Sequence, residues 1–211
     1  MDVDTGANVL LSSLSAAGIC ICFANPGTTE MHLCAALDNL QGRIQPILCL
    51  HENAATGAAD GFARMTGRPA AVILHLGPGL ANGIANLHNA RRARSPVCVL
   101  VGDMATWHAQ ADPVLSMDIT AIAAAVSERV IRFQTSQEAE SRQPLEAAAD
   151  FIVHETPGIQ GRFGSHIVTM IIPHDASWLP GSSLPTASAV RAAFAGMGER
   201  CIFGEGRGLL V

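Results

Sequence analysis

The stretch 69-PAAVILHL-76 decides the fold class, because it is apolar almost throughout. A strand with one exposed face would instead alternate apolar and polar residues. A second stretch of this kind, 96-PVCVLVGD-103, follows one predicted helix later. Strands with apolar residues on both faces are typical of parallel sheets that helices cover on either side. Shorter runs of the same kind alternate with segments of helical spacing. This order predicts an α/β fold with a doubly wound, mostly parallel sheet and helices on both faces.

The remaining elements follow from the spacing of apolar residues and from the glycines and prolines between them. The segments 77–79 and 155–165 are predicted to be a turn and an exposed loop. Further strands are expected at 19–24, 46–50, 129–134 and 166–173, and helices at 7–17, from Thr28 or Thr29 to about 40, at 52–66, at 80–92 and at about 136–154.

The chain divides into one large unit and a short tail. Residues 1–178 carry all the elements of the predicted domain. The segment 179–188, rich in proline and serine, is predicted to be a linker. Residues 189–211 resemble the first helix and strand of a further α/β domain. They are too few to build a core of their own.

Composition excludes several classes of protein. Of the 211 residues, 49% are hydrophobic and 15% are charged, and the net charge is -5, which argues against disorder and against nucleic-acid binding. The basic run 91-RRAR-94 is interpreted as the solvated end of a helix, with a phosphate site as the alternative. No signal peptide or membrane helix is evident, and the six cysteines form no CxxC pair. We therefore expect free thiols and a cytoplasmic protein.

Polar residues follow four of the predicted strands and should meet at one edge of a parallel sheet. Among them, Glu52 stands between apolar 48-LCL-50 and the small residues of the next helix. It is either a helix-start acid that favours the helix dipole or a desolvated carboxyl with a chemical task.

The glycine-rich turn 77-GPGLANG-83 does not fit the dinucleotide fingerprint, because its third glycine comes one position late. No Walker A lysine accompanies it. A purely structural turn and a turn that lets a flat ligand approach the backbone both stay open.

Several motifs taken together carry a family resemblance: 25-NPGTTE-30, 52-ENAATGAADGFAR-64, 75-HLGPGLANGIANLHNARRARSPV-97 and 102-GD-103. They resemble the N-terminal, pyrimidine-binding domain of thiamine-diphosphate enzymes, in the branch of acetolactate synthase and benzoylformate decarboxylase. The resemblance covers about residues 5–178. It implies a 2-keto acid decarboxylase or carboligase that uses thiamine diphosphate.

The resemblance also implies roles for single residues. Glu52 matches the glutamate that hydrogen-bonds the aminopyrimidine and activates the cofactor. Thr28 matches a hydroxyl residue at the substrate mouth. His75 matches a proton-shuttling histidine, with a histidine bonded to a backbone carbonyl as the alternative. His51 is assigned to orientation or packing, and Asn86 and Asn89 to polar helix positions or cofactor contacts. Cofactor contacts are expected from Pro26, Gly27, Glu52, Gly77, Pro78, Gly79 and Asn82.

One part of the family pattern is missing. Full-length members bind the diphosphate through magnesium with a G-D-G motif, which this sequence lacks. No metal site is therefore expected on this chain, and magnesium is expected on a missing domain or a partner chain. The resemblance implies a homo-oligomer or a complex with a subunit that carries the diphosphate-binding domain. The alternatives are a non-catalytic remnant, a regulatory or dimerisation domain, and one subunit of a two-chain decarboxylase.

Overall fold

A seven-stranded sheet forms the centre of the computed structural model, which describes residues 5–134, 152–157 and 166–179. The strand order is β2-β1-β3-β4-β7-β5-β6. Neighbouring strands are parallel except for β5 and β6, which are antiparallel at one edge. The sheet is therefore mostly parallel, as the apolar runs predict. The strands are β1 (Ile21–Asn25), β2 (Gln45–Leu48), β3 (Ala70–Leu74), β4 (Val97–Asp103), β5 (Arg129–Gln134), β6 (Ile152–Pro157) and β7 (Ile167–Pro173).

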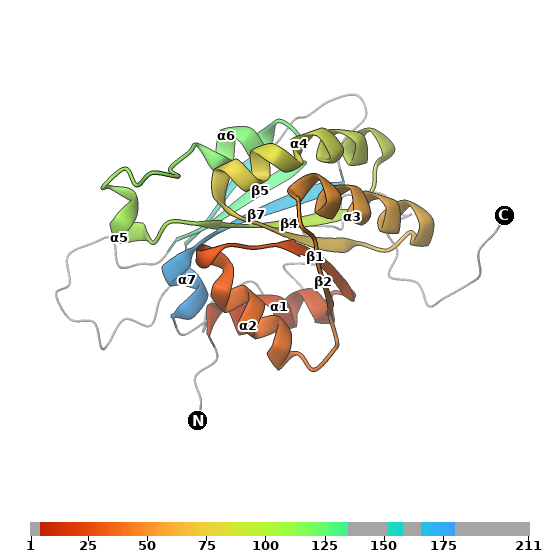
Figure 1. Cartoon of the computed structure of the whole chain (residues 1–211), viewed down its shortest axis with the longest axis horizontal. Helices are drawn as coiled ribbons and strands as arrows, with labels where there is room; N and C mark the ends of the chain where they lie inside the picture. Colours follow the sequence, from red (N-terminus) through yellow and green to blue (C-terminus); the bar gives the residue numbers. More distant parts are fainter. Residues whose placement is uncertain (1–4, 135–151, 158–165, 180–211) are drawn as a thin grey trace.

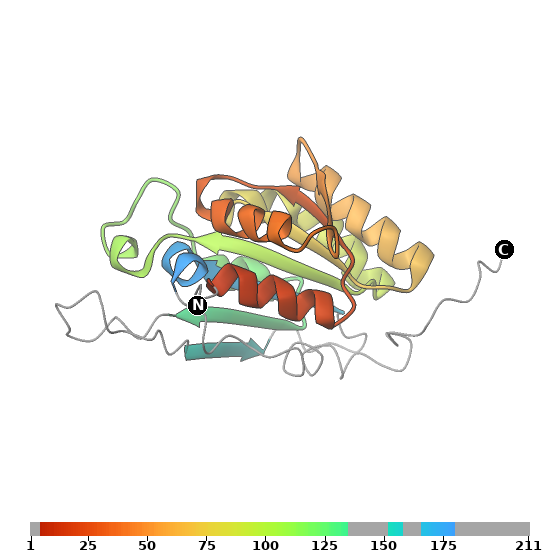
Figure 2. The same ribbon diagram turned by 90° about the horizontal axis from the view of Figure 1, so that it is seen from below.

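Helices cover both faces of the sheet, as predicted (Figure 1). Helices α1 (Gly6–Ala16), α2 (Met31–Asn39) and α7 (His174–Trp178) lie on one face, and Figure 2 views the molecule from their side. Helices α3 (Glu52–Thr66), α4 (Leu76–Ala93) and α6 (Ile119–Ala124) lie on the other. A 3-10 helix, η1 (Thr28–Glu30), precedes α2, and α5 (Thr106–Ala109) follows β4.

Each apolar strand supplies two separate cores. In β3, Ala71 and Ile73 pack toward α1 and α2, whereas Val72 and Leu74 pack toward α3 and α4. All residues of β3, β4 and β7 are buried. Removing this apolar surface from water on both sides is the main driving force for the layered fold. The core thiols Cys22 and Cys98 are both free, and burial raises the pKa of Cys98 to about 12.

The strand at 46–50 is shorter and more exposed than predicted. It ends at Leu48, and all four residues of β2 are exposed, including Leu48 with 71% of its surface accessible. The reason is its position, because β2 forms an edge of the sheet beside β1. An edge strand can carry apolar residues without being buried, and Pro46 is compatible with an edge.

The predicted turn at 77–79 is wrong, because these residues form the first turn of α4. Gly79 N donates to His75 O over 2.8 Å, which is a helical hydrogen bond. Pro78 is tolerated there because the first N–H groups of a helix have no partner within it. The start of α2 also differs, since the turn begins at Gly27 and passes through η1 instead of being capped by Thr28 or Thr29.

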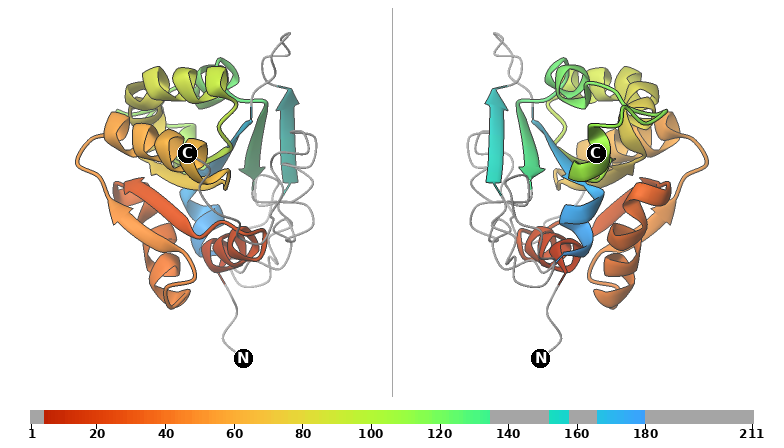
Figure 3. Two further views of the ribbon diagram at one scale, coloured as in Figure 1. Left: turned by 90° about the vertical axis from the view of Figure 1, so that its right-hand side faces the viewer. Right: turned by 90° about the vertical axis from the view of Figure 1, so that its left-hand side faces the viewer.

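The end of the predicted domain differs in one respect. The predicted helix at 136–154 and loop at 155–165 lie largely outside the described residues. Residues 152–157, however, form β6 and not helix or loop (Figure 3). Pairing with β5 overrides the local helical pattern there. The predicted linker at 179–188, apart from Leu179, and the tail at 189–211 also lie outside the described residues.

Candidate functional site

The polar residues predicted to converge meet where the chain reverses its direction across the sheet. Strand β1 pairs with β2 on one side and with β3 on the other. Connections from neighbouring strands leave in opposite directions at such a point, and the crevice between them is where open α/β sheets bind ligands. The segment after β1, the start of α3 and the start of α4 therefore border one rim.

His75 is held at this rim by a carboxylate. It follows β3 directly, and its Nδ1 lies 2.8 Å from Glu30 Oε2 and 3.3 Å from Thr29 Oγ1. Its side chain is 26% exposed, so one side of the ring is accessible. The alternative of a histidine bonded to a backbone carbonyl is thus replaced by a histidine bonded to a glutamate. The contact with Glu30 thus fixes the orientation of the ring.

Glu52 begins α3 and faces the same rim. Its Oε2 accepts a hydrogen bond of 3.2 Å from Asn82 Nδ2, which projects from α4. Among the described residues, Asn82 is the one hydrogen-bond partner of the Glu52 carboxyl. The carboxyl therefore retains free acceptor positions. A Cβ added to Gly79 would lie 3.5 Å from Glu52 Oε1 and 3.5 Å from His75 Cβ. The single residue Gly79 thus separates the two groups predicted to act in catalysis.

Of the two alternatives for Glu52, the desolvated carboxyl is not seen among the described residues. Glu52 is only partly buried, and Leu50 is 90% exposed beside it. The cause is again the edge position of β2, which leaves Leu48 and Leu50 on the surface.

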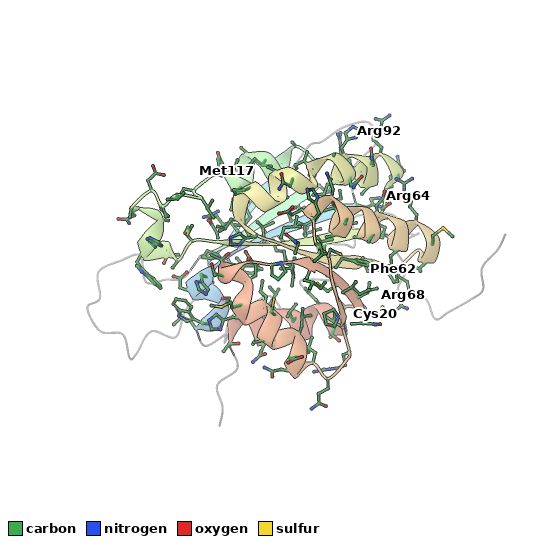
Figure 4. All side chains as sticks on the ribbon, viewed as in Figure 1. Cys20, Phe62, Arg64, Arg68, Arg92 and Met117 are labelled. Carbon is green, nitrogen blue, oxygen red and sulfur yellow. The ribbon has the colours of Figure 1, made fainter. Side chains whose placement is uncertain are left out.

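The other predicted contact residues border the rim at different depths. Thr28 is exposed, Pro26 and Gly27 are partly buried, and Pro78 is partly buried in the first turn of α4. Gly77 is buried under Met117, whose side chain a Cβ at that position would meet. Figure 4 shows Met117 close to the start of α4. Gly77 therefore serves packing rather than the open surface.

His51 and the two further asparagines have structural partners. His51 Nδ1 accepts from Asn53 N over 3.1 Å and caps α3. Asn86 Nδ2 donates to the Asn53 carbonyl over 2.7 Å and ties α4 to α3. The carbonyl of Asn89 accepts from Arg64 over 3.3 Å.

Asp60 and Arg64, the second acid and the arginine of the 52–64 motif, connect α3 to α4 and to the residues after it. Asp60 accepts two hydrogen bonds from Arg64, of 2.8 and 2.7 Å, and a further one from Ser95. Arg64 and Arg92 lie near the C-terminal ends of α3 and α4 (Figure 4), whereas Glu52 begins α3. Arg92 is exposed there, as expected for a solvated helix end.

Glu30 is the residue that the sequence alone did not single out. It lies in the recognised 25–30 motif but reads as one more acid in a helix start. The structure buries it completely and surrounds it with hydrogen-bond donors. Its one sequence signal is Gly102 at the end of β4, which leaves space for the carboxyl.

The described residues show neither a metal-binding cluster nor a membrane-spanning helix. No group of three or more His, Cys, Asp or Glu side chains in the described part of the chain is arranged to hold a metal ion. None of the helices described is long and apolar enough to cross a lipid bilayer.

Comparison with known families decides what this rim belongs to. The family model of the thiamine pyrophosphate enzyme N-terminal TPP binding domain matches residues 4–130. The chain belongs to this family. The recognised motifs at 25–30, 52–64, 75–97 and 102–103 all fall inside the match, and the rim is built mainly from the first three.

Related proteins agree with this assignment. The chain is 49% identical over 191 residues to IlvX of Mycobacterium tuberculosis, a candidate acetolactate synthase large subunit, covering 90% of this chain and 35% of that protein. It is 36% identical over 106 residues to the acetolactate synthase large subunit of Buchnera aphidicola, covering 50% and 18%. It is 41% identical over 85 residues to benzoylformate decarboxylase of Pseudomonas aeruginosa, covering 40% and 16%.

A solved structure supports the fold. A candidate thiamin diphosphate-dependent enzyme from Mycobacterium smegmatis matches with a TM-score of 0.63 and 25% identity, over 88% of this chain and 34% of that one. The chain thus spans about a third or less of the length of these relatives, and it is an N-terminal domain related to that of acetolactate synthase.

Proposed function

We propose that the chain supplies the pyrimidine-binding half of a thiamine-diphosphate-dependent 2-keto acid decarboxylase or carboligase, in which Glu52 activates the cofactor. The observation that carries the proposal is the open carboxyl of Glu52 at the switch point of the sheet. In the described part of the chain, one hydrogen bond from Asn82 orients it and leaves acceptor positions for a ligand. A group that already had every partner could not serve a cofactor in this way.

The residues at the rim fit a flat, nitrogen-containing ring. Gly79 has no side chain beside Glu52 Oε1, so a ring can approach the carboxyl and the backbone closely. Gly27 leaves the His75 ring in direct contact with the turn after β1. Polar groups of both kinds, an acid and an imidazole, border the same space.

When bound, thiamine diphosphate supplies a thiazolium ring that acts as the nucleophile and electron acceptor for the keto acid. Glu52 is proposed to share a proton with a ring nitrogen of the aminopyrimidine and so to promote loss of the thiazolium proton. His75 is proposed to move protons at the substrate, and Thr28 to border its entrance. The protein would contribute the orientation of the reacting groups and side chains that donate and accept protons.

We further propose that the chain works in association with a second polypeptide. Exposed apolar side chains occur on β2, just after it and on the segment before α6, where Leu48, Leu50 and Val114 are 71%, 90% and 99% exposed. Surfaces of this kind mark protein interfaces. The partner is either a second copy or a subunit with a diphosphate-binding domain, which would also hold the magnesium ion. Such a partner would shield Glu52 from water.

Exchange of the cofactor's C2 proton with deuterium tests the role of Glu52. The assembled enzyme, which is this chain together with its diphosphate-binding half, should exchange the proton rapidly. The Glu52→Gln variant should exchange it at least about a hundred times more slowly, because an amide cannot supply the proton. Glu52→Asp should lose less, since the acid is kept but shortened.

The matched control is Asp38→Asn, which removes one exposed carboxylate on α2 and should leave the exchange rate unchanged. The chain alone should bind thiamine diphosphate weakly and release no carbon dioxide from pyruvate or benzoylformate. Parent-like exchange in Glu52→Gln would show that Glu52 is only a helix-start acid. The chain would then be better described as a non-catalytic domain.

A further inference from the structure

Glu30 has an environment that general packing does not explain. Its side chain has no solvent-accessible surface. Oε2 accepts from Gly27 N over 2.8 Å and faces His75 Nδ1 at 2.8 Å, and Oε1 accepts from Thr29 Oγ1 over 2.6 Å. Burying a carboxyl is costly unless hydrogen-bond donors surround it. Here three different groups are directed at its two oxygens.

Two glycines from separate segments make this arrangement possible. A Cβ on Gly102, at the end of β4, would overlap the Glu30 carboxyl and the Thr29 hydroxyl. A Cβ on Gly27 would overlap the His75 ring. The space for the carboxyl and the space for the imidazole are therefore both built into the backbone.

The arrangement has a consequence for the two nitrogens of His75. Nδ1 is directed at Glu30, and in an imidazole ring Nε2 lies on the opposite side. No hydrogen-bond partner of Nε2 occurs among the described residues. If Gly27 and Thr29 both donate to the carboxyl, the Nδ1 proton completes the set of three donors. Nε2 then carries a lone pair on the accessible side of the ring.

We propose that Glu30 is a positioning residue that holds His75 as its Nδ1–H tautomer and presents Nε2 to the rim. The tautomer of a histidine is set by the hydrogen bond that its other nitrogen makes. Glu30 thereby determines which atom of His75 accepts or donates protons. The part of this inference that concerns proton transfer rests on the proposed function, whereas the tautomer itself does not.

Nitrogen NMR of the 211-residue chain without cofactor tests the inference directly. Histidine labelled with nitrogen-15 gives separate signals for protonated and unprotonated ring nitrogens, and His75→Gln identifies the His75 signals among the eight histidines. At a pH where His75 is neutral, Nδ1 should be protonated and Nε2 unprotonated. The reverse pattern, or an average of the two tautomers, would overturn the proposal.

A pair of variants separates positioning from general packing. Glu30→Gln keeps the side-chain volume but replaces one acceptor oxygen with an amide donor, so the His75 signals should shift. Asp38→Asn removes an exposed charge on α2 and should leave them in place. Unchanged His75 signals in a folded Glu30→Gln variant would contradict the proposal. Should this variant not fold, the parent spectrum still decides.

A second readout links the tautomer to the reaction. In the assembled enzyme, Glu30→Gln should reduce turnover by about 10- to 100-fold, in the range seen for partners that orient ligating histidines. Combined with His75→Gln, it should cause little further loss, because both changes act through the same nitrogen. Additive losses would show that Glu30 acts independently of His75.

The C2 proton exchange should be nearly unchanged in Glu30→Gln, since that step is assigned to Glu52. Failure of the Glu52 proposal and failure of the Glu30 proposal therefore give different results. The first appears as normal exchange in Glu52→Gln, and the second as the wrong tautomer of His75.

Discussion

Two glutamates stand at the same edge of the sheet and are held in different ways. Glu30 is completely buried, with donors from the turn after β1 directed at its oxygens and His75 Nδ1 in contact with Oε2. Glu52 is partly exposed and has one hydrogen bond, from Asn82, among the described residues. A carboxyl whose acceptor positions are taken can orient its neighbours, whereas a carboxyl with open positions can bind a ligand. The difference separates a positioning role from a cofactor-binding role.

The largest effect on stability is expected where the backbone encloses Glu30. In Gly102→Ala, the added methyl group would overlap the carboxyl in a strand that is buried along its whole length. Overpacking together with the displaced hydrogen bonds should lower the free energy of unfolding by about 3 kcal/mol in urea titrations. Gly61→Ala on α3 is the matched control, because nothing lies within 4 Å of the added atom. It should stabilise the chain by about 0.5 kcal/mol, and equal behaviour of the two variants would refute the tight enclosure of Glu30.

A smaller effect should follow from the same substitution at both glutamates. Glu30→Gln leaves buried donors with one acceptor oxygen fewer, which should cost about 2 kcal/mol of unfolding free energy. Glu52→Gln changes a partly exposed side chain and should stay within about 0.5 kcal/mol of the parent. Urea titrations of the two variants at neutral pH measure the difference. Similar losses for both would mean that the closed and open environments do not differ as described.

Much of the fold could be predicted from apolar runs and helix signals. Helix α3 has the predicted bounds, 52–66, because its small residues keep helical spacing and Gly67 ends it in a left-handed conformation. The exposed edge strand β2 could not be predicted, because its apolar residues look the same whether a helix covers them or not. The start of α4 was missed because a Gly-Pro-Gly run is typical of turns. The positive φ of 53° at Leu76 belongs to this unusual helix start and leaves no trace in composition.

The site could also be predicted only in part, because motifs identify single residues but not the contacts between distant ones. The family motifs led to Glu52, His75 and Gly79, and the structure brings these three together. The pairing of Glu30 with His75 joins residues 45 positions apart and depends on the space beside Gly102. Long-range contacts of this kind have no local signature in a single sequence.

The smallest expected effect on stability concerns His174. Its Nε2 is buried without a hydrogen-bond partner among the described residues, unlike the Glu30 carboxyl. Helix α7 packs against the 3-10 helix that ends in Glu30, and His174 Nε2 has no hydrogen-bond partner among the described residues. Its ring contacts Trp178 at 4.5 Å and His32 at 5.5 Å between centroids. Burial, and to a lesser degree the neighbouring His32, lower the pKa of His174 below its usual value.

The sign of the pH dependence follows from this direction. Between the unfolded pKa of about 6.5 and the lower folded pKa, the unfolded chain binds more protons than the folded one. The contribution of His174 to the free energy of unfolding is therefore unchanged above pH 6.5 and falls as the pH drops through this window. Because His174 is partly exposed, screening should keep the loss below about 0.5 kcal/mol.

His174→Phe keeps an aromatic ring beside Trp178 but cannot titrate. Urea titrations at pH 7.5 and 5.5 should therefore give a smaller difference in the free energy of unfolding for this variant than for the parent. Burial also lowers the pKa of His166, so part of the pH dependence of the unfolding free energy should remain in this variant. An unchanged difference in His174→Phe would mean that the imidazole is solvated in the folded chain and that its lack of partners carries no cost.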